Sequence, residues 1–162
     1  NLDHVAGLHL VGGDVDPLAV HQDGVVSHDL ARFATMMLHG GTLDGARILG
    51  AETIATFTVF ADPSFSNRAL GWQKRERPGM AYRTGAAWSG ERMSVSSYGH
   101  TGFTGTSMGL DPERDLYVIL LTNRVNPTRN NPRITAVRVA VTDAVVSVID
   151  ARRGSVANPE SP

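Results

Sequence analysis

Residues 98 to 124 read Tyr98-Gly-His-Thr-Gly-Phe-Thr-Gly-Thr-Ser-Met-Gly-Leu-Asp-Pro-Glu-Arg-Asp-Leu-Tyr-Val-Ile-Leu-Leu-Thr-Asn-Arg124, and this stretch decides the fold. Together with the residues just before it, the pattern predicts three strands, over 93–103, 106–111 and 116–123. Connections as short as 103–105 and 111–115 imply antiparallel neighbours. The run 116–121 is almost wholly apolar, as expected for a strand that is buried on both faces.

Helical patterns flank these strands. Ser27 predicts the N-cap of a first helix, which ends at the glycine pair 40–41. Apolar residues of this helix recur at helical spacing, namely Leu30, Phe33, Ala34, Met37 and Leu38. A shorter helix is expected over 52–59. Pro132 suits the first turn of a long C-terminal helix running to about Ile149, and its buried stripe would be Ile134, Val137, Val141, Ala144, Val145 and Val148.

The other segments carry weaker patterns. Residues 1–26 show no sustained period and predict a loop with at most a short strand. Residues 69–73 predict a strand, and 74–91 a loop rich in charge and glycine.

Composition excludes several classes of protein. The chain has 162 residues, of which 41% are hydrophobic and 19% charged, as in a soluble globular domain. Fifteen basic against sixteen acidic residues give no electrostatic reason to expect nucleic acid or an anionic membrane as a partner. No run of about 18 apolar residues predicts a transmembrane segment. Cysteine is absent, so disulfide and thiolate chemistry are excluded.

The quoted stretch resembles the third conserved box of the β-lactamase-like serine hydrolases and the hairpin that follows it. This superfamily includes class C β-lactamases, D-Ala-D-Ala peptidases, D-aminopeptidases and esterases. The box is Lys-Thr-Gly or His-Thr-Gly in its members, and residues 100–102 match the second form. Supporting matches are Ser-x-Asp-Leu-Ala-Arg-Phe at 27–33, the glycine pair at 40–41 and Leu-Gly-Trp at 70–72. The resemblance covers roughly residues 7–150.

The resemblance implies roles for four residues. The backbone N–H of Phe103 would supply one donor of the oxyanion hole, which stabilises the charge that develops during acyl transfer. Thr101 would offer its hydroxyl to a substrate carboxylate or amide, and Gly102 would let a substrate backbone approach the strand. His100 would replace the positively charged lysine, with a charge that depends on pH because a histidine titrates at a pKa of about 6.5.

Two other elements of the family pattern are absent. The nucleophile is the serine of a Ser-x-x-Lys box, but the only lysine here is Lys74, and Gly71 stands three residues before it. No tyrosine begins a Tyr-x-Asn box, and Ser-Phe-Ser-Asn at 64–67 lies in an expected loop. The sequence starts with neither Met nor a signal peptide, so we expect the C-terminal portion of a longer protein that is inactive alone. The missing N-terminal lobe would carry the Ser-x-x-Lys box.

The expected architecture is α+β, an antiparallel sheet with the C-terminal helix packed on it and part of a helical lobe. Residues 1–150 would be the C-terminal portion of one β-lactamase-like domain. Within it, 1–60 would belong to the helical lobe and 69–150 to the sheet and helix, and 151–162 would be a flexible tail. Without the strands of the missing lobe, 116–123 would be an open edge, so the chain alone would be marginally stable or associate.

Other functions stay open. The chain could be a non-catalytic module of the same fold that binds a peptidoglycan-like peptide. His4, His9, His21, His28 and His39 raise a metal-binding alternative, but their spacing matches no metal motif, so we expect neither metal nor cofactor. The resemblance implies a small-molecule or peptide substrate, whether β-lactam, D-amino-acid peptide or ester. The compartment is open, although many members of the family are periplasmic or secreted.

Overall fold

The computed structural model describes residues 5–12, 24–64, 66–75, 88–130 and 132–157. The elements follow in the order β1 (Val5–Gly12), α1 (Gly24–Leu38), β2 (Thr42–Leu43), β3 (Ala46–Arg47), α2 (Ala51–Thr58), β4 (Gln73–Lys74), β5 (Tyr98–Thr101), β6 (Ser107–Asp111), β7 (Leu116–Thr122) and α3 (Ile134–Ala157). They confirm the α+β class and the antiparallel sheet.

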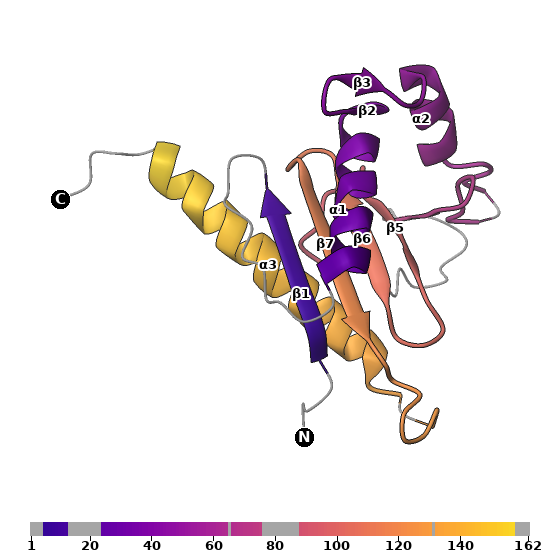
Figure 1. Ribbon diagram of the computed structural model, residues 1–162, viewed down its shortest axis with the longest axis vertical. Coiled ribbons are helices and arrows are strands. Elements are labelled where there is room, and N and C mark those ends of the chain that lie inside the picture. Colours follow the sequence, from indigo (N-terminus) through magenta and orange to yellow (C-terminus); the bar gives the residue numbers. More distant parts are fainter. Residues whose placement is uncertain (1–4, 13–23, 65, 76–87, 131, 158–162) are drawn as a thin grey trace.

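The main sheet has the strand order β1-β7-β6-β5-β4, and every neighbouring pair is antiparallel. Helices α1 and α3 lie on opposite faces of it (Figure 1). Alternate residues of β7 separate the two cores, since Tyr117 and Ile119 pack with α1, whereas Leu116 and Val118 pack with α3. The prediction that this strand is buried on both faces is therefore confirmed.

Helix α1 begins three residues before the predicted cap. It starts at Gly24, so Ser27 lies in the first turn and does not cap the helix. The predicted end is confirmed, because Gly40 and Gly41 have φ angles of 61° and 91°, and the Gly41 N–H donates to Met36 O at 2.8 Å. Helix α2 also begins one residue earlier than predicted.

The strand predicted over 69–73 is wrong except at its last residue. Gly71 has a φ of 79°, the Ala69 N–H donates to Trp72 O at 2.9 Å, and Arg68 bridges to Gln73. Residues 69–72 are therefore a tight turn, made possible by the left-handed conformation of Gly71. Strand β4 follows, and it includes the buried Lys74, where we expected the start of a loop.

Strand β5 begins at Tyr98, five residues later than predicted. The Oγ of Ser94 lies 2.8 Å from Ser96 Oγ and 3.0 Å from Ser97 Oγ, and the Ser97 N–H donates to Ser94 O. Serine side chains that bond locally compete with a strand ladder. The segment before β5 therefore forms turns.

Strand β1 corrects the expectation that β7 would be an open edge. Residues from Val5 to Gly12 pair with β7 over nearly its whole length, and β1 is the outer strand. These residues lie in the sheet, so the assignment of 1–60 to a helical lobe is wrong for this segment. Since β7 is paired on both sides, it offers no open edge through which the chain would associate.

Helix α3 runs eight residues further than predicted, to Ala157, so 151–157 are not a flexible tail; residues 158–162 lie outside the described part. Its buried residues are Arg138, Thr142, Val145 and Val146, whereas Val148 is 52% exposed. The buried face thus differs from the predicted stripe. Apolar periodicity could not show this, because two of the four residues are polar.

The ring of Trp88 packs on a pair of glycines in neighbouring strands. Gly99 and Gly109 are partners across β5 and β6, and a Cβ on either would lie 2.5 Å or 2.9 Å from Trp88 Cε3. Trp88 is only 1% exposed. Trp88 therefore packs in the core.

Gly99→Ala is expected to lower the free energy of unfolding by about 1–3 kcal/mol through overpacking. The new Cβ would also meet the backbone oxygen of Met108 at 2.4 Å. Urea denaturation of both proteins measures the change. The matched control is Gly154→Ala at an exposed position of α3, where a new Cβ would have no atom within 4 Å. There the same substitution should raise the free energy of unfolding slightly, because alanine is the better helix former. Equal stabilities of the Gly99 variant and wild type would contradict this packing.

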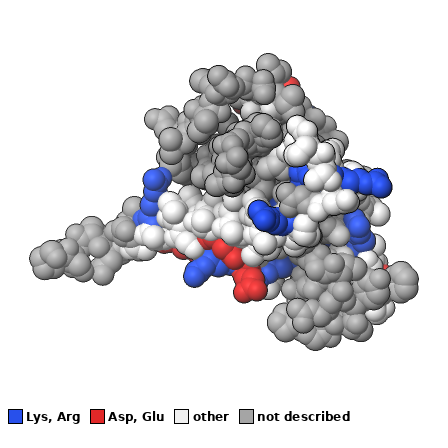
Figure 2. Space-filling view, turned by 90° about the horizontal axis from the view of Figure 1, so that it is seen from below, with Lys and Arg blue, Asp and Glu red and all other residues white. Residues whose placement is uncertain are grey.

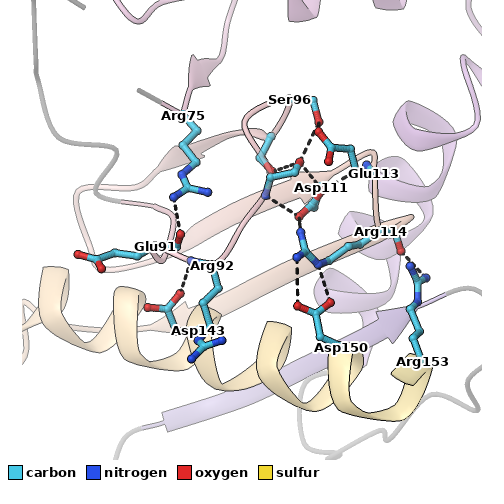
Figure 3. A network of polar contacts seen from close by, with 12 residues as sticks. Arg75, Glu91, Arg92, Ser96, Asp111, Glu113, Arg114, Asp143, Asp150 and Arg153 are labelled. Atoms are coloured by element: carbon cyan, nitrogen blue, oxygen red, sulfur yellow. Dashed lines mark hydrogen bonds and ion pairs between the residues drawn. The ribbon is translucent and has the colours of Figure 1, made fainter. Parts of the chain in front are cut away.

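A polar network joins the turn between β6 and β7 to α3 (Figure 3). Asp111 is fully buried and accepts hydrogen bonds from the backbone and Oγ of Ser94, at 2.9 and 2.5 Å, and from Arg114 Nη1 at 2.9 Å. Arg114 also pairs with Asp150 of α3 at 2.8 and 3.1 Å, and this contact lowers the pKa of Asp150. The network fixes the hairpin against the helix behind the sheet.

Candidate active site

The turn that follows β5 and the loop that follows β7 meet at one end of the sheet. Both strands are antiparallel to β6, so they run in the same direction, and α3 begins at this same end (Figure 1). A pocket of about 330 Å³ opens there, lined by Thr101, Gly102, Phe103, Arg124, Pro132, Ile134, Thr135 and Arg138. Seen from this end, Lys and Arg cover more of the described surface than Asp and Glu (Figure 2).

Three of the four predicted site residues come together at this pocket. Thr101 ends β5, and Gly102 to Thr106 form the turn, closed by bonds from the Gly102 N–H to Thr106 O and from the Gly105 N–H to Gly102 O, at 2.8 and 3.1 Å. Phe103 is 68% exposed, and its N–H donates to no acceptor in the described part of the chain. The turn therefore presents a backbone donor that an incoming ligand can use.

Two glycines of this turn are required by close contacts. A Cβ on Gly102 would lie 2.2 Å from Thr106 Oγ1. This contact favours glycine at position 102 independently of any substrate. Gly105 has a φ of 117°, and a Cβ there would lie 2.4 Å from Thr122 Oγ1. The turn thus packs directly against the end of β7.

The fourth predicted residue, His100, does not line the pocket. Its exposed ring lies beside Arg68, with 3.1 Å between His100 Nε2 and Arg68 Nη1 and 2.9 Å between His100 Nδ1 and Thr101 O. An arginine can only donate, so in this arrangement Nε2 is the acceptor of the contact with Arg68. Arg68 therefore places a fixed positive charge beside the box, in addition to the histidine that the sequence analysis singled out.

Sequence reasoning placed neither Arg138 nor Arg124 in the site. Arg124 Nε donates to Phe103 O at 2.7 Å, and its guanidinium lies 4.7 Å from the centre of the Phe103 ring. Arg138 is 5% exposed and forms no ion pair with a described carboxylate. Burial lowers the pKa of Arg138, and the charge of Arg124 lowers it further. The pocket thus holds two neighbouring cations.

Tyr98, at the start of the box strand, is unsuited to act as a base. It is 3% exposed and packs edge-on against Trp72, with ring centres 5.2 Å apart. Burial raises its pKa to about 12, so the phenol stays protonated at neutral pH. It supports β5 from within the core.

Neither a metal centre nor a membrane span is found in the described residues. No group of three His, Asp or Glu there could hold a metal ion, and none of the described helices could cross a bilayer. His4 and His21 lie outside the described residues.

Comparison with known proteins agrees with this fold. Residues 11–142 match the Beta-lactamase family. The chain belongs to this family. Putative D-alanyl-D-alanine carboxypeptidases of Salmonella paratyphi B and Salmonella newport are each 31% identical to it over 108 residues, which is 67% of this chain and 24% of theirs. The chain therefore spans about a quarter of the length of these curated relatives.

A solved member of the Beta-lactamase family shares the fold. The crystal structure of a β-lactamase from Mycobacterium bovis matches with a TM-score of 0.56 and 23% identity, over 75% of this chain and 43% of that one. The family match over residues 11–142 confirms the relationship to β-lactamase-like proteins that was inferred from residues 98–124.

Proposed function

We propose that this chain forms one side of the active site of a serine hydrolase that transfers acyl groups from a peptide or β-lactam. In this proposal the Phe103 N–H is a donor of the oxyanion hole. Thr101 and Gly102 bind the substrate along the end of β5, and His100 with Arg68 flanks them. The observation that carries the proposal is that the N–H of the exposed Phe103 has no acceptor among the described residues.

The charge of the pocket favours a substrate with a free carboxylate next to the scissile bond. Arg138 is buried without a carboxylate partner among the described residues, and its Nε atom has no hydrogen-bond partner there. Such a group is costly to bury unless an anion compensates it. A β-lactam or a peptide ending in D-Ala supplies that anion, whereas a simple ester does not. The D-alanyl-D-alanine carboxypeptidase names of the relatives point the same way.

The nucleophile would come from outside this sequence. The chain contains no Ser-x-x-Lys box, and acyl transfer of this type needs an activated serine. We therefore infer that the isolated chain does not turn over substrate. A second lobe with this box would complete the site.

The test joins the chain to the protein segment encoded upstream of Asn1, which the proposal expects to carry Ser-x-x-Lys. Hydrolysis of an N-acyl-D-Ala-D-Ala peptide is compared with that of its C-terminal amide, with nitrocefin as a β-lactam probe. A charge-assisted hydrogen bond contributes about 1.5–3 kcal/mol, so kcat/KM should be about tenfold to a hundredfold higher for the free acid. The isolated chain should show no turnover.

Three outcomes separate the alternatives. If the joined protein hydrolyses none of the probes and binds none, the proposal is rejected. Binding of the peptide without turnover would favour the non-catalytic peptide-binding module. Equal rates on acid and amide would keep the hydrolase but reject the carboxylate preference.

A further inference from the structure

Arg138 reaches from α3 to both ends of the turn that presents Phe103. Its Nη2 donates to Gly102 O at 2.9 Å and to Thr106 O at 2.8 Å. These two carbonyls also accept the backbone bonds that close the turn. One buried nitrogen therefore holds the two ends of the turn in register, across 36 residues of sequence.

The contact to Gly102 O acts on the N–H of the next residue. The Gly102 carbonyl and the Phe103 N–H belong to the same peptide group, which is planar and trans. They point in opposite directions across that plane. A donor that fixes the carbonyl toward α3 therefore aims the N–H away from α3.

The following peptide group is fixed as well. Arg124 Nε donates to Phe103 O, and its backbone N–H donates to Thr104 O, both at 2.7 Å. Hydrogen bonds from a guanidinium are stronger than those between neutral groups, and they polarise the amide that accepts them. Both peptide groups that flank Phe103 thus have their carbonyls bound by a cation.

A buried cation is an expensive way to close a turn. Arg138 has no carboxylate partner among the described residues, and it lies near a second cation, Arg124. Burial lowers the pKa of Arg138. A neutral donor would satisfy the same two carbonyls at a lower desolvation cost. This cost points to a role for the charge beyond holding the turn together.

We propose that Arg138 is the positioning residue of the oxyanion donor, because it sets the direction of the Phe103 N–H and polarises that amide through Gly102 O. This proposal rests on the proposed function, in which the Phe103 N–H binds the developing oxyanion. Arg138 itself touches neither the oxyanion nor the nucleophile in this role. Its effect is therefore expected in kcat more than in KM.

The variants are Arg138→Met, which removes the donor and the charge, and Arg138→Gln, which keeps a neutral donor. The matched control is Arg153→Met, because Arg153 also extends from α3 to a backbone carbonyl, that of Arg114 at 2.7 Å. In the joined protein, with the C-terminal amide as substrate so that carboxylate binding does not enter, Arg138→Met should lower kcat about a hundredfold with KM within about threefold, since small misplacements cost this much. Arg138→Gln should fall between it and wild type, and Arg153→Met should match wild type.

The second measurement does not need turnover. In the isolated chain, the ¹H–¹⁵N residual dipolar coupling of Phe103 reports the direction of its N–H. We expect it to change in both Arg138 variants and to stay as in wild type in Arg153→Met. If Arg138→Met does not fold, kcat and the Phe103 coupling of Arg138→Gln test the positioning role instead.

The results distinguish the two proposals. An unchanged Phe103 coupling, or a changed coupling with wild-type kcat, would overturn the positioning role while the hydrolase stands. If the wild-type joined protein has no activity, the proposed function fails, and the role of Arg138 in catalysis fails with it. A changed coupling together with a loss of kcat supports both.

Discussion

Replacing Asp111 by alanine is expected to lower the free energy of unfolding by about 3–5 kcal/mol, because it leaves part of a buried ion pair uncompensated. The carboxylate is fully buried and accepts from the Ser94 N–H, the Ser94 hydroxyl and Arg114. Its loss leaves the buried Ser94 N–H without its acceptor and removes one of the two partners of Arg114. The free energy of unfolding of a small domain is about 5–15 kcal/mol in total, so this one substitution would remove a large part of it.

Urea denaturation followed by circular dichroism measures this loss. The control is Glu113→Ala in the same turn, where an exposed carboxylate accepts from Ser96 Oγ at 2.8 Å. Exposed contacts of this kind contribute about 0–1 kcal/mol. A loss for Asp111→Ala as small as that for Glu113→Ala would show that the network does not hold the hairpin to α3.

The strands and helix ends that could be predicted from sequence are those in which local pattern and local structure agree. The apolar run 116–121 is a central strand, and the glycine pair that follows α1 takes the left-handed conformation that ends a helix. In these places a few consecutive residues contain all the information. Their neighbours in space do not change the outcome.

The errors have a common physical cause, namely contacts between segments that are far apart in sequence. Arg138 is buried because it reaches the carbonyls of a turn 32 and 36 residues away. The turns before β5 combine local serine contacts with a hydrogen bond from Ser94 to Asp111, 17 residues away. Strand β1 could not be placed because its partner β7 lies more than 100 residues along the chain. The periodicity of apolar residues depends only on neighbours along the chain, so it cannot predict contacts between residues that are far apart in sequence.

The candidate site also contains some residues that a local pattern could predict and others that only long-range contacts bring together. Thr101, Gly102 and Phe103 are consecutive, so a family pattern could point to all of them at once. Arg68 and Arg138 come from other elements, and only the fold brings them to the end of β5. The structure also places the fixed charge of Arg68 beside His100, a contact that no local motif contains.

Phe103→Pro removes the proposed oxyanion donor with little change to the turn. Residues 102–105 form a four-residue turn in which the Gly105 N–H donates to Gly102 O. Phe103 is the second residue of that turn, where proline is well accepted. Its N–H holds no described acceptor, so the substitution breaks no backbone bond of the turn. The Phe103 carbonyl stays available to Arg124.

The loss of one oxyanion-hole donor costs about 10²–10³ in kcat. Phe103→Ala is the matched control, because it removes the same ring and its contact with Arg124 but keeps the N–H. Melting temperatures of the two variants should agree within a few degrees.

The kcat of Phe103→Pro relative to Phe103→Ala, in the chain joined to its upstream segment, tests the central claim most directly. The account predicts a loss of about a hundredfold to a thousandfold in kcat for the proline variant alone. Equal turnover by the two variants, with equal melting temperatures, would show that the Phe103 N–H is not part of the catalytic machinery.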